Sequence, residues 1–363
     1  MFDAANGGVL VVKTRTRSAR GALGPVAAVS EPGHDAFEHT AAISGDGDAI
    51  VTWTSADAAS GSDVKARWRS AAGALGPVLA VGDPALDSFG PQVAVNAVGD
   101  ATFAWTVGDV ATGRTRTQTR SGAAGGALGP IADLSDPARN AGDVHLAVAP
   151  DGDAVFDWLD LDAATSRASA QARSRSRGGT LGEIVDLSSP TDDASDPAVG
   201  VADDGDAELT WWIIDRAGAR VEARSLSARG SAGPRVTLSD GADDGYEPDV
   251  AVAGDGRAVY TWLAFDSSGV RVQARSRSPR GVLGPTADVT RPAEDAFSAQ
   301  VAITGDGDAV LGWSAINGAG YQVLGRSRSV TGTLGPLAIV STDGRDAFEA
   351  GVNRTSEHLG ASR

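Results

Sequence analysis

The chain has 363 residues, including 47 Gly, 16 Pro and no Cys, and 42% of its residues are hydrophobic and 21% charged. This hydrophobic share is ordinary for a globular protein and argues against disorder, while the lack of cysteine excludes disulfides, thiol catalysis and cysteine-based zinc sites. Acidic residues outnumber basic ones by 47 to 31, so the net charge is −16, which disfavours nucleic acid and anionic membranes as partners.

A short segment, Gly-Ala-Leu-Gly-Pro or a close variant, recurs along the chain at a nearly constant distance. Its copies start at Gly21, Gly73, Gly126, Gly179, Gly230, Gly281 and Gly332. The spacings are 52, 53, 53, 51, 51 and 51 residues. Six complete repeats therefore fill 21–331, and the remaining end segments, 332–363 and 1–20, together make a seventh. A period of this length with several short strands predicts a β-propeller, and a repeat divided between the chain ends predicts that its ring is closed by the terminal segments.

Each repeat holds four short strands, as the sixth one illustrates. A strand over 283–290 precedes a second strand over 300–303, and a tight turn leads into its partner over 309–313. The last strand, 322–329, alternates in period two as a half-exposed strand does. Since no segment has helical periodicity with caps, we predict an all-β chain in which residues 1–363 form a single domain, a seven-bladed propeller of four-stranded antiparallel blades.

The fourth repeat shows a pattern that can be compared with known propellers. Val-Gly-Val-Ala-Asp-Asp-Gly-Asp-Ala at 199–207 is followed by Thr210-Trp211 and by Val221-Glu-Ala-Arg224. This order of a Val-rich strand, an Asp/Gly turn, a second strand and an Arg-containing strand resembles NHL-type repeats, with Trp where those repeats usually carry Asp. The turns bear a weaker likeness to the Asp-box turns of sialidase-like propellers. The NHL resemblance implies a propeller that serves as a rigid binding platform.

An arginine lies six residues before the first Gly of every repeat. These residues are Arg15, Arg67, Arg120, Arg173, Arg224, Arg275 and Arg326. Such a ring could present paired donors to a carboxylate or a sulfate-rich ligand. We favour the structural alternative, in which each Arg lies across a neighbouring strand, near a Trp and paired with an Asp.

A tryptophan recurs once per complete repeat, at the end of the strand that follows the tight turn. These residues are Trp53, Trp105, Trp158, Trp211, Trp262 and Trp313. We predict that each one is the large apolar plug between adjacent blades, with sugar binding as the alternative, and that Trp262 and Arg275 share one face of their hairpin. Trp68 and Trp212 fall outside the pattern, so they are better candidates for exposed, ligand-facing aromatics.

Asp-Gly-Asp turns recur in four repeats. Their carboxylates are Asp46 and Asp48, Asp151 and Asp153, Asp204 and Asp206, and Asp306 and Asp308. Calcium requires about six to eight oxygen ligands, more than one tight turn provides, so we interpret the motif as turn chemistry with Gly at positive φ. We therefore expect no metal and no cofactor, with calcium as the alternative.

Strand alternation places the loops before the Val-rich strands and the loops after the Trp strands on one face, where propellers normally make ligand contacts. An acid and an aromatic, two residues apart, recur in these loops at Asp35 and Phe37, Asp87 and Phe89, Asp244 and Tyr246, Asp295 and Phe297, and Asp346 and Phe348. Two repeats, at 140–142 and 193–195, lack the aromatic. We name these ten residues as candidate ligand-binding residues; the structural alternative makes the aromatic a lid over the core and Asp a turn-former.

Catalysis has little support in the sequence. The four histidines occupy non-equivalent positions without metal-ligand spacing, and no Gly-x-Ser-x-Gly elbow accompanies a helix. We predict a non-catalytic binding or scaffold propeller that binds a glycan, a protein or a small ligand on the acid-aromatic face. The alternative is a carbohydrate-active, sialidase-like glycoside hydrolase, although no pair of carboxylates stands out as catalytic.

The sequence also bears on the cellular setting. No apolar run reaches the ~20 residues that span a bilayer, and Met1–Ala4 does not begin a signal peptide. The Asp/Ser/Gly-rich repeats are similar in style to secreted bacterial repeat proteins, so we expect an extracellular or cell-surface monomer. Since 356–363 takes the place of a Trp strand without its Trp, either a degraded strand closes the ring or the chain is a piece of a longer exported protein.

Overall fold

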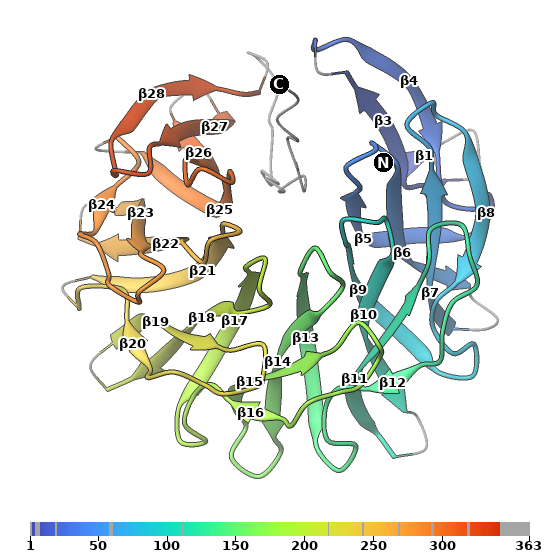
Figure 1. The fold of residues 1–363 in the computed structure, drawn as a ribbon, viewed down its shortest axis with the longest axis horizontal. Coiled ribbons are helices and arrows are strands. Elements are labelled where there is room, and N and C mark those ends of the chain that lie inside the picture. Colours follow the sequence, from blue (N-terminus) through green and yellow to red (C-terminus); the bar gives the residue numbers. More distant parts are fainter. Residues whose placement is uncertain are drawn as a thin grey trace. The chain divides into compact units, whose positions relative to one another are not determined.

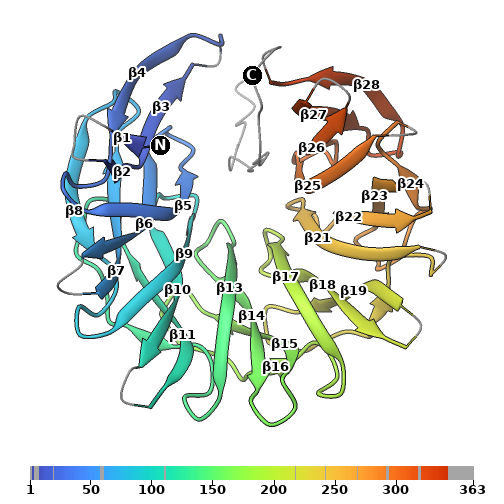
Figure 2. The same ribbon diagram turned by 180° about the vertical axis from the view of Figure 1, so that it is seen from behind.

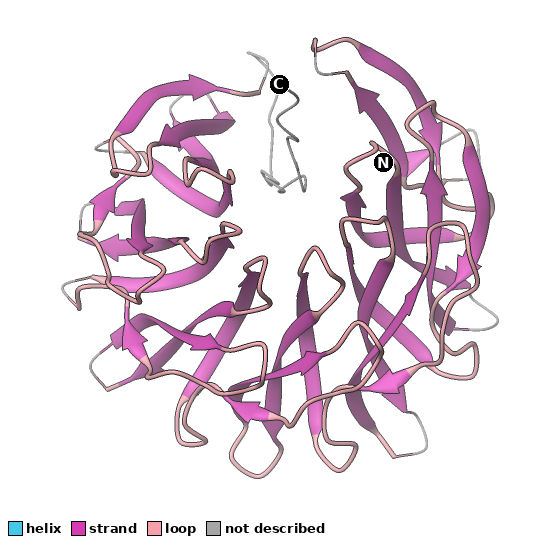
Figure 3. Ribbon diagram, in the orientation of Figure 1, coloured by secondary structure: helices cyan, strands magenta, loops and turns pink. Residues whose placement is uncertain are grey.

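The computed structural model of the protein describes residues 2–3, 8–18, 20–57, 61–109, 112–216, 218–241, 243–267, 269–291, 294–317 and 320–341. All regular secondary structure in these ranges is β, and none of their residues lies in a helix (Figure 3). The all-β prediction is confirmed. The described ranges therefore hold no helix that could cross a membrane.

The chain forms two compact units. Unit 1 consists of Met1–Gly152 with Thr355–Arg363, and unit 2 of Asp153–Arg354. The third repeat falls on both sides of this division, since its first two strands belong to unit 1 and the other two to unit 2. The expectation of a single domain over 1–363 stays a prediction.

Unit 1 holds two strand pairs, two four-stranded antiparallel sheets and one further strand (Figure 1). The pairs are β1 (Phe2–Asp3) with β2 (Val9–Leu10) and β3 (Lys13–Arg17) with β4 (Leu23–Ala28). The sheets are β5 (Asp35–Ile43), β6 (Ala49–Asp57), β7 (Gly61–Arg69) and β8 (Leu75–Ala80), then β9 (Asp87–Val95), β10 (Ala101–Asp109), β11 (Arg114–Gly122) and β12 (Ala132–Asp133). Strand β13 (Asn140–Val148) packs beside β9, β10 and β11.

Unit 2 continues the same pattern (Figure 2). Strands β14 (Ala154–Asp162), β15 (Arg167–Arg175) and β16 (Val185–Asp186) pair in order. Three four-stranded sheets follow: β17 (Asp193–Val201), β18 (Ala207–Asp215), β19 (Gly218–Leu226) and β20 (Val236–Thr237); β21 (Asp244–Val252), β22 (Ala258–Asp266), β23 (Gly269–Arg277) and β24 (Ala287–Asp288); β25 (Asp295–Ile303), β26 (Ala309–Asn317), β27 (Gly320–Arg328) and β28 (Leu334–Ile339). The first strands β17, β21 and β25 lie next to one another.

The sheets and the sequence repeats are out of phase by one strand. The short strand after each Gly-x-Leu-Gly-Pro segment was expected to open a blade, but it closes the preceding one: β24 pairs with β23 through Gln273 opposite Asp288. The reason is the tight turn before it, in which the Gly281 N–H donates to the Ser278 carbonyl at 2.8 Å. A four-residue turn returns the chain onto its own sheet, whereas the longer segment after β24 crosses to the next one.

The first strands are longer than the sequence predicted, and β5, β9, β17, β21 and β25 carry a β-bulge. The acid-aromatic residues expected in loops form their opening residues, as in β21, where Asp244 pairs with Phe265 and Tyr246 with Leu263. Beyond them two residues, Glu247 and Pro248, lie opposite the single residue Trp262. The bulge is the two-against-one irregularity that bends a strand and re-aims a side chain, and Pro suits it because no ladder hydrogen bond is needed there.

The six recurring tryptophans form the core. Trp53, Trp105, Trp158, Trp211, Trp262 and Trp313 are all 0% exposed. Trp262 packs with Tyr260 and Val221, and Trp313 with Leu311 and Val289. Their burial excludes a surface sugar contact at these six positions and fits the predicted plugs between sheets.

The recurring arginines bond to backbone carbonyls. The Nε of each one donates to the Gly carbonyl nine residues on, at 2.5–2.8 Å, in Arg15, Arg67, Arg120, Arg173, Arg224, Arg275 and Arg326. Nη1 of Arg275 also reaches the Leu238 carbonyl of the preceding sheet at 3.0 Å. The expected Asp partner is thus replaced by carbonyl groups, because β24 and its equivalents leave these oxygens within reach. Since Arg275 pairs with Tyr260, two residues from Trp262, it shares the predicted face with that tryptophan.

The ring closure expected from 332–363 and 1–20 depends on residues 342–363, which lie outside the described ranges. Asp346 and Phe348, two of the candidate binding residues, lie there as well.

Candidate ligand-binding site

The acids of the acid-aromatic pairs tether neighbouring sheets. Oδ1 of each accepts a hydrogen bond from a backbone N–H 25 residues earlier, which lies on β2 for Asp35 and on the third strand of the preceding sheet for the others. The pairs are Leu10 with Asp35 (2.7 Å), Ser62 with Asp87 (3.0 Å), Ala219 with Asp244 (2.8 Å) and Val270 with Asp295 (3.3 Å). Asn140 and Asp193 do the same in the repeats that lack the aromatic. The acid therefore has a structural task in every described copy.

This tether explains a neighbouring glycine. A Cβ at Gly218 would lie 2.4 Å from Oδ1 of Asp244, and Gly218 has a φ of 117°. Both the close approach of the carboxylate and the positive φ require the absence of a side chain. Glycine at position 218 therefore permits both the tight hairpin turn and the hydrogen bond from the Ala219 N–H to Asp244.

The aromatic residues gather most densely in unit 2. Tyr246 makes edge-to-face contacts with Trp212, at 4.9 Å between ring centroids, and with Phe265, at 5.1 Å. Trp212 and Tyr246 are half-buried, and Phe265 is 42% exposed. The three rings come from β18, β21 and β22, and we call them the aromatic cluster.

Trp212 replaces an aromatic that its own first strand lacks. It lies directly opposite Ser195 on β17, the position that carries Phe or Tyr in other repeats. Its ring reaches Tyr246 of the next sheet. The sequence predicted Tyr246 as a member of the acid-aromatic pairs and Trp212 as an aromatic outside any repeated pattern. The fold brings these two rings into contact. Trp68, the other outlier, is half-buried against the core cluster of Phe103 and Trp105 in unit 1.

An acid that the sequence analysis did not single out follows the aromatic position. Glu38, Asp196 and Glu247 each occupy the first bulge residue with a φ of 47°, as Ser298 does with a φ of 52°, and Asp143 has a φ of 55° at the equivalent position of β13. Non-glycine residues adopt this left-handed conformation at a cost, and such strain concentrates at functional sites. Gly90 stands at the same position with a φ of 60°, and this glycine was the signal in the sequence for a special backbone conformation.

Asp196 and Glu247 lie beside the aromatic cluster. The Trp212 Nε1–H donates to Oδ2 of Asp196 at 2.5 Å, and Glu247 directly follows Tyr246. Partial burial raises the pKa of the Glu247 carboxyl, and the negative charge of Asp196 raises it further, while a hydrogen bond from the Ser298 N–H acts in the opposite direction. The negative charge of Asp196 therefore disfavours ionisation of the Glu247 carboxyl.

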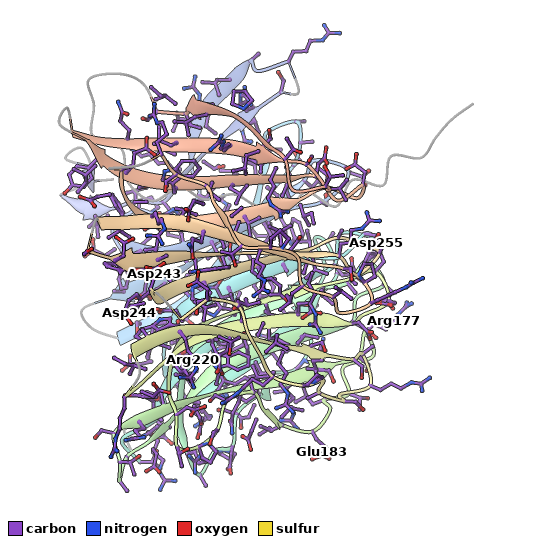
Figure 4. All side chains as sticks on the ribbon, turned by 90° about the vertical axis from the view of Figure 1, so that its left-hand side faces the viewer. Arg177, Glu183, Arg220, Asp243, Asp244 and Asp255 are labelled. Atoms are coloured by element: carbon purple, nitrogen blue, oxygen red, sulfur yellow. The ribbon has the colours of Figure 1, made fainter. Side chains whose placement is uncertain are left out.

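Other acids at this end of unit 2 are neutralised by arginines. Arg220 pairs with Asp215, and Arg271 pairs with Asp243 and Asp266. Figure 4 shows Arg220, Asp243 and Asp244 at one end of the strands, with Arg177, Glu183 and Asp255 at the other. Within the described ranges, the salt bridges include neither Asp196 nor Glu247.

Exposed apolar side chains extend the same end of unit 2. The eighth residue of each second strand is a large one: Leu161 (43% exposed), Ile214 (47%), Phe265 (42%) and Ile316 (43%). A further edge-to-face pair joins Phe297 and Tyr321 at 5.8 Å. Four exposed apolar residues at one register position form a repeated feature rather than scattered surface residues, and we call them the apolar rim.

The opposite end of the strands is occupied by the Asp-Gly-Asp turns. Their second carboxylate caps a turn of the same sheet: Oδ1 of Asp48, Asp153, Asp206 and Asp308 accepts from the N–H of Ala71, Arg177, Ala228 and Val330 at 2.7–2.9 Å. Within the described ranges there is no group of three or more His, Asp or Glu that could hold a metal ion. A cavity of about 210 Å³ at this end of unit 2 is lined by Val155, Ser174, Gly205, Ala228 and neighbouring residues.

Comparisons with known proteins identify the fold. No protein-family model matches the sequence, and no curated protein matches it. Among solved structures, the chain is similar to the BP39L lectin from Burkholderia pseudomallei, with a TM-score of 0.60, 10% identity and 93% of each chain covered. It is also similar to a PL25 ulvan lyase bound to a GlcA-Rha3S ligand (TM-score 0.52, 10% identity, 77% of each chain). A protein of unknown function from Dyadobacter fermentans gives a TM-score of 0.51 at 10% identity, over 81% of this chain and 94% of that one.

The chain is therefore an all-β protein of the β-propeller class. At 10% identity these likenesses establish the fold alone.

Proposed function

We propose that the protein is a non-catalytic binding module that takes a glycan at the aromatic cluster of unit 2. The observation that carries the proposal is three rings in edge-to-face contact, partly open to solvent, beside two carboxylates that lack an arginine partner among the described residues. Aromatic side chains that keep one part exposed offer an apolar platform. Carboxylates accept hydrogen bonds from hydroxyl groups placed on that platform.

The charge of the molecule narrows the ligand class. A net charge of −16 and two local carboxylates repel polyanions and favour a neutral or cationic ligand. The apolar rim adds contact area at the same end of the sheets. A glycan combines hydroxyl groups with apolar C–H faces, so it matches both kinds of surface better than a uniformly charged polymer does.

The neighbours support a sugar ligand by analogy. The Burkholderia pseudomallei protein is a lectin, and the PL25 lyase was solved with a GlcA-Rha3S ligand. We extend the proposal to an extracellular or cell-surface location, to a monomeric state and to repeats of NHL type, for which the hairpin pattern of the fourth repeat is the support. A protein ligand on the same face is the other partner that this surface would suit.

A glycoside hydrolase is the second candidate. Burial and the charge of Asp196 raise the pKa of the Glu247 carboxyl, and a carboxyl with a raised pKa beside a second carboxylate is what acid–base cleavage of a glycosidic bond uses. Incubation with a panel of oligosaccharides distinguishes the two functions. A binding module returns them uncut, whereas hydrolysis that disappears in Glu247→Gln would replace the binding proposal with the enzyme.

The binding proposal is tested by calorimetric titration of the protein with oligosaccharides from the panel. Tyr246→Ala should abolish the heat of binding, because Tyr246 contacts both other rings. Trp68→Ala, which removes a half-buried tryptophan from unit 1, is the matched control and should bind as the unmodified protein does. Undiminished binding by Tyr246→Ala would contradict the proposed site.

A further inference from the structure

The charges and rings of the aromatic cluster indicate which kind of sugar it would bind. We propose that the site prefers an amino sugar with a free, protonated amine over its neutral, N-acetylated counterpart. This inference rests on the proposed function and names the ligand class of that site.

The first argument is the placement of charge. At this end of unit 2 the carboxylates of Asp215, Asp243 and Asp266 are held by Arg220 and Arg271. Asp192 is held by Arg235 at 2.5 Å. Asp196 and Glu247, the two carboxylates at the cluster, take part in none of the salt bridges within the described ranges, and neither do the tether acids Asp193, Asp244 and Asp295. Arginines therefore balance several acids at this end of unit 2, whereas the two carboxylates beside the rings have no arginine partner among the described residues.

The second argument is how these two carboxylates are held. The bulge, with φ of 47° at both Asp196 and Glu247, fixes their backbone in a conformation that β-strands avoid. Asp196 uses Oδ2 to accept the Trp212 Nε1–H at 2.5 Å, which fixes the indole ring beside it. Glu247 lies next to Tyr246 as an exposed side chain whose carboxyl also accepts a hydrogen bond from the Ser298 N–H. A charged N–H donor placed there would offset the negative charge of Asp196 that Glu247 experiences.

The third argument is the rings themselves. The face of a tryptophan or tyrosine ring attracts a cation, more strongly as water is displaced. Edge-to-face packing at 4.9 and 5.1 Å turns successive rings by 69° and 80°, so the cluster offers faces in more than one direction. An ammonium group attached to a sugar can therefore contact a ring face and donate to the Glu247 carboxylate, while the sugar's C–H face packs on a neighbouring ring. The N-acetyl group offers one neutral N–H donor instead, and a neutral donor bonds a carboxylate more weakly than an ammonium does.

The test is a pair of calorimetric titrations at neutral pH with glucosamine oligomers and N-acetylglucosamine oligomers of the same length. The unmodified protein should bind the free-amine oligomer at least about tenfold more tightly, as a charge-assisted hydrogen bond predicts. Added salt should reduce this preference, because charges near the surface are screened. Equal affinity for the two oligomers would overturn the inference while leaving the proposed function standing. If neither oligomer bound, and no other sugar did, the proposed function itself would fail.

Two variants test whether the preference for the free-amine oligomer arises at the aromatic cluster. Glu247→Gln keeps the size of the side chain and should bring the two affinities together. Glu38→Gln removes a charge from the equivalent bulge position in unit 1 and should leave the preference unchanged. If both variants reduce it equally, the preference comes from the net charge of the protein and the inference is wrong.

Discussion

The second strands of unit 1 and unit 2 have the same interior but different ends. Their buried tryptophans are alike: Trp105 on β10 and Trp262 on β22 are both 0% exposed. Their eighth residues differ, since β6 and β10 carry Ala56 and Gly108, while β14, β18, β22 and β26 carry the large residues of the apolar rim. The interior position is fixed by packing in every sheet, whereas the end position contributes little to stability and is free to serve a ligand. This difference supports the proposal of a ligand site in unit 2.

The largest expected effect concerns the shared interior. Trp105→Ala and Trp262→Ala should each lower the free energy of unfolding by about 3–5 kcal/mol, because removing a buried indole leaves a cavity. Urea denaturation monitored by circular dichroism measures both. A loss much smaller for one variant than for the other would show that the two interiors are not equivalent.

The next largest effect concerns ligand affinity at the ends of the second strands. Phe265→Ala in unit 2 should weaken binding of the free-amine oligosaccharide about tenfold, because the exposed ring of the cluster is lost. Phe89→Ala removes the acid-aromatic ring of β9 in unit 1 and is the matched control, with no expected loss. Calorimetric titration measures both affinities. An equal loss in the two variants would mean that the binding surface is not confined to unit 2.

A smaller effect concerns the tethers, which both units share. Asp244→Ala should cost about 1 kcal/mol in the free energy of unfolding, because the Ala219 N–H loses its acceptor. Asp244→Asn should cost much less, since Asn140 accepts the same hydrogen bond from Thr115 in unit 1. Urea denaturation separates the two. If the Asn variant is as unstable as the Ala variant, the charge rather than the hydrogen bond holds the sheets together.

The smallest effect is a pH dependence at Glu247. Its pKa is raised in the folded protein, so protonation favours the fold: this contribution is fully present below the ordinary value of the carboxyl and is lost as the pH rises through the raised value. Glu247→Gln should therefore raise stability at pH 7 by less than about 1 kcal/mol, since the group is exposed, and should have no such effect near pH 4.

Thermal unfolding of Glu247→Gln and of the unmodified protein at both pH values measures this difference. Glu38→Gln provides the equivalent change in unit 1. A Glu247→Gln variant that is less stable than the unmodified protein at pH 7 would contradict the sign.

The sequence was sufficient for the fold class because the repeat is nearly regular. Short apolar runs, tight turns and period-two alternation recur in each repeat and predicted four short antiparallel strands, while the periodic Trp and Arg residues report packing that every sheet needs. The phase of the sheets was wrong by one strand, because a repeat has no natural starting point and only the Ser278–Gly281 turn decides which sheet the short strand joins.

The site was harder to predict because it depends on departures from the repeat. The acid-aromatic pairs can be recognised in the sequence, but they were predicted to lie in loops, so the bulge that follows them was not predicted. Asp196 and Glu247 were not predicted as site residues because they follow the repeated positions and are not part of them. Trp212 was singled out as an irregular aromatic. Its contact with Tyr246 could not be predicted, since it joins two sheets through a register that only the folded bulge sets.

The most direct test of the central claim is a crystal structure of the protein with a glucosamine oligomer bound. The account predicts electron density for a sugar ring against Tyr246, Phe265 or Trp212, with its amine within hydrogen-bonding distance of the Glu247 carboxylate. Density for the sugar at the Asp-Gly-Asp end of the strands, with none at the aromatic cluster, would contradict it.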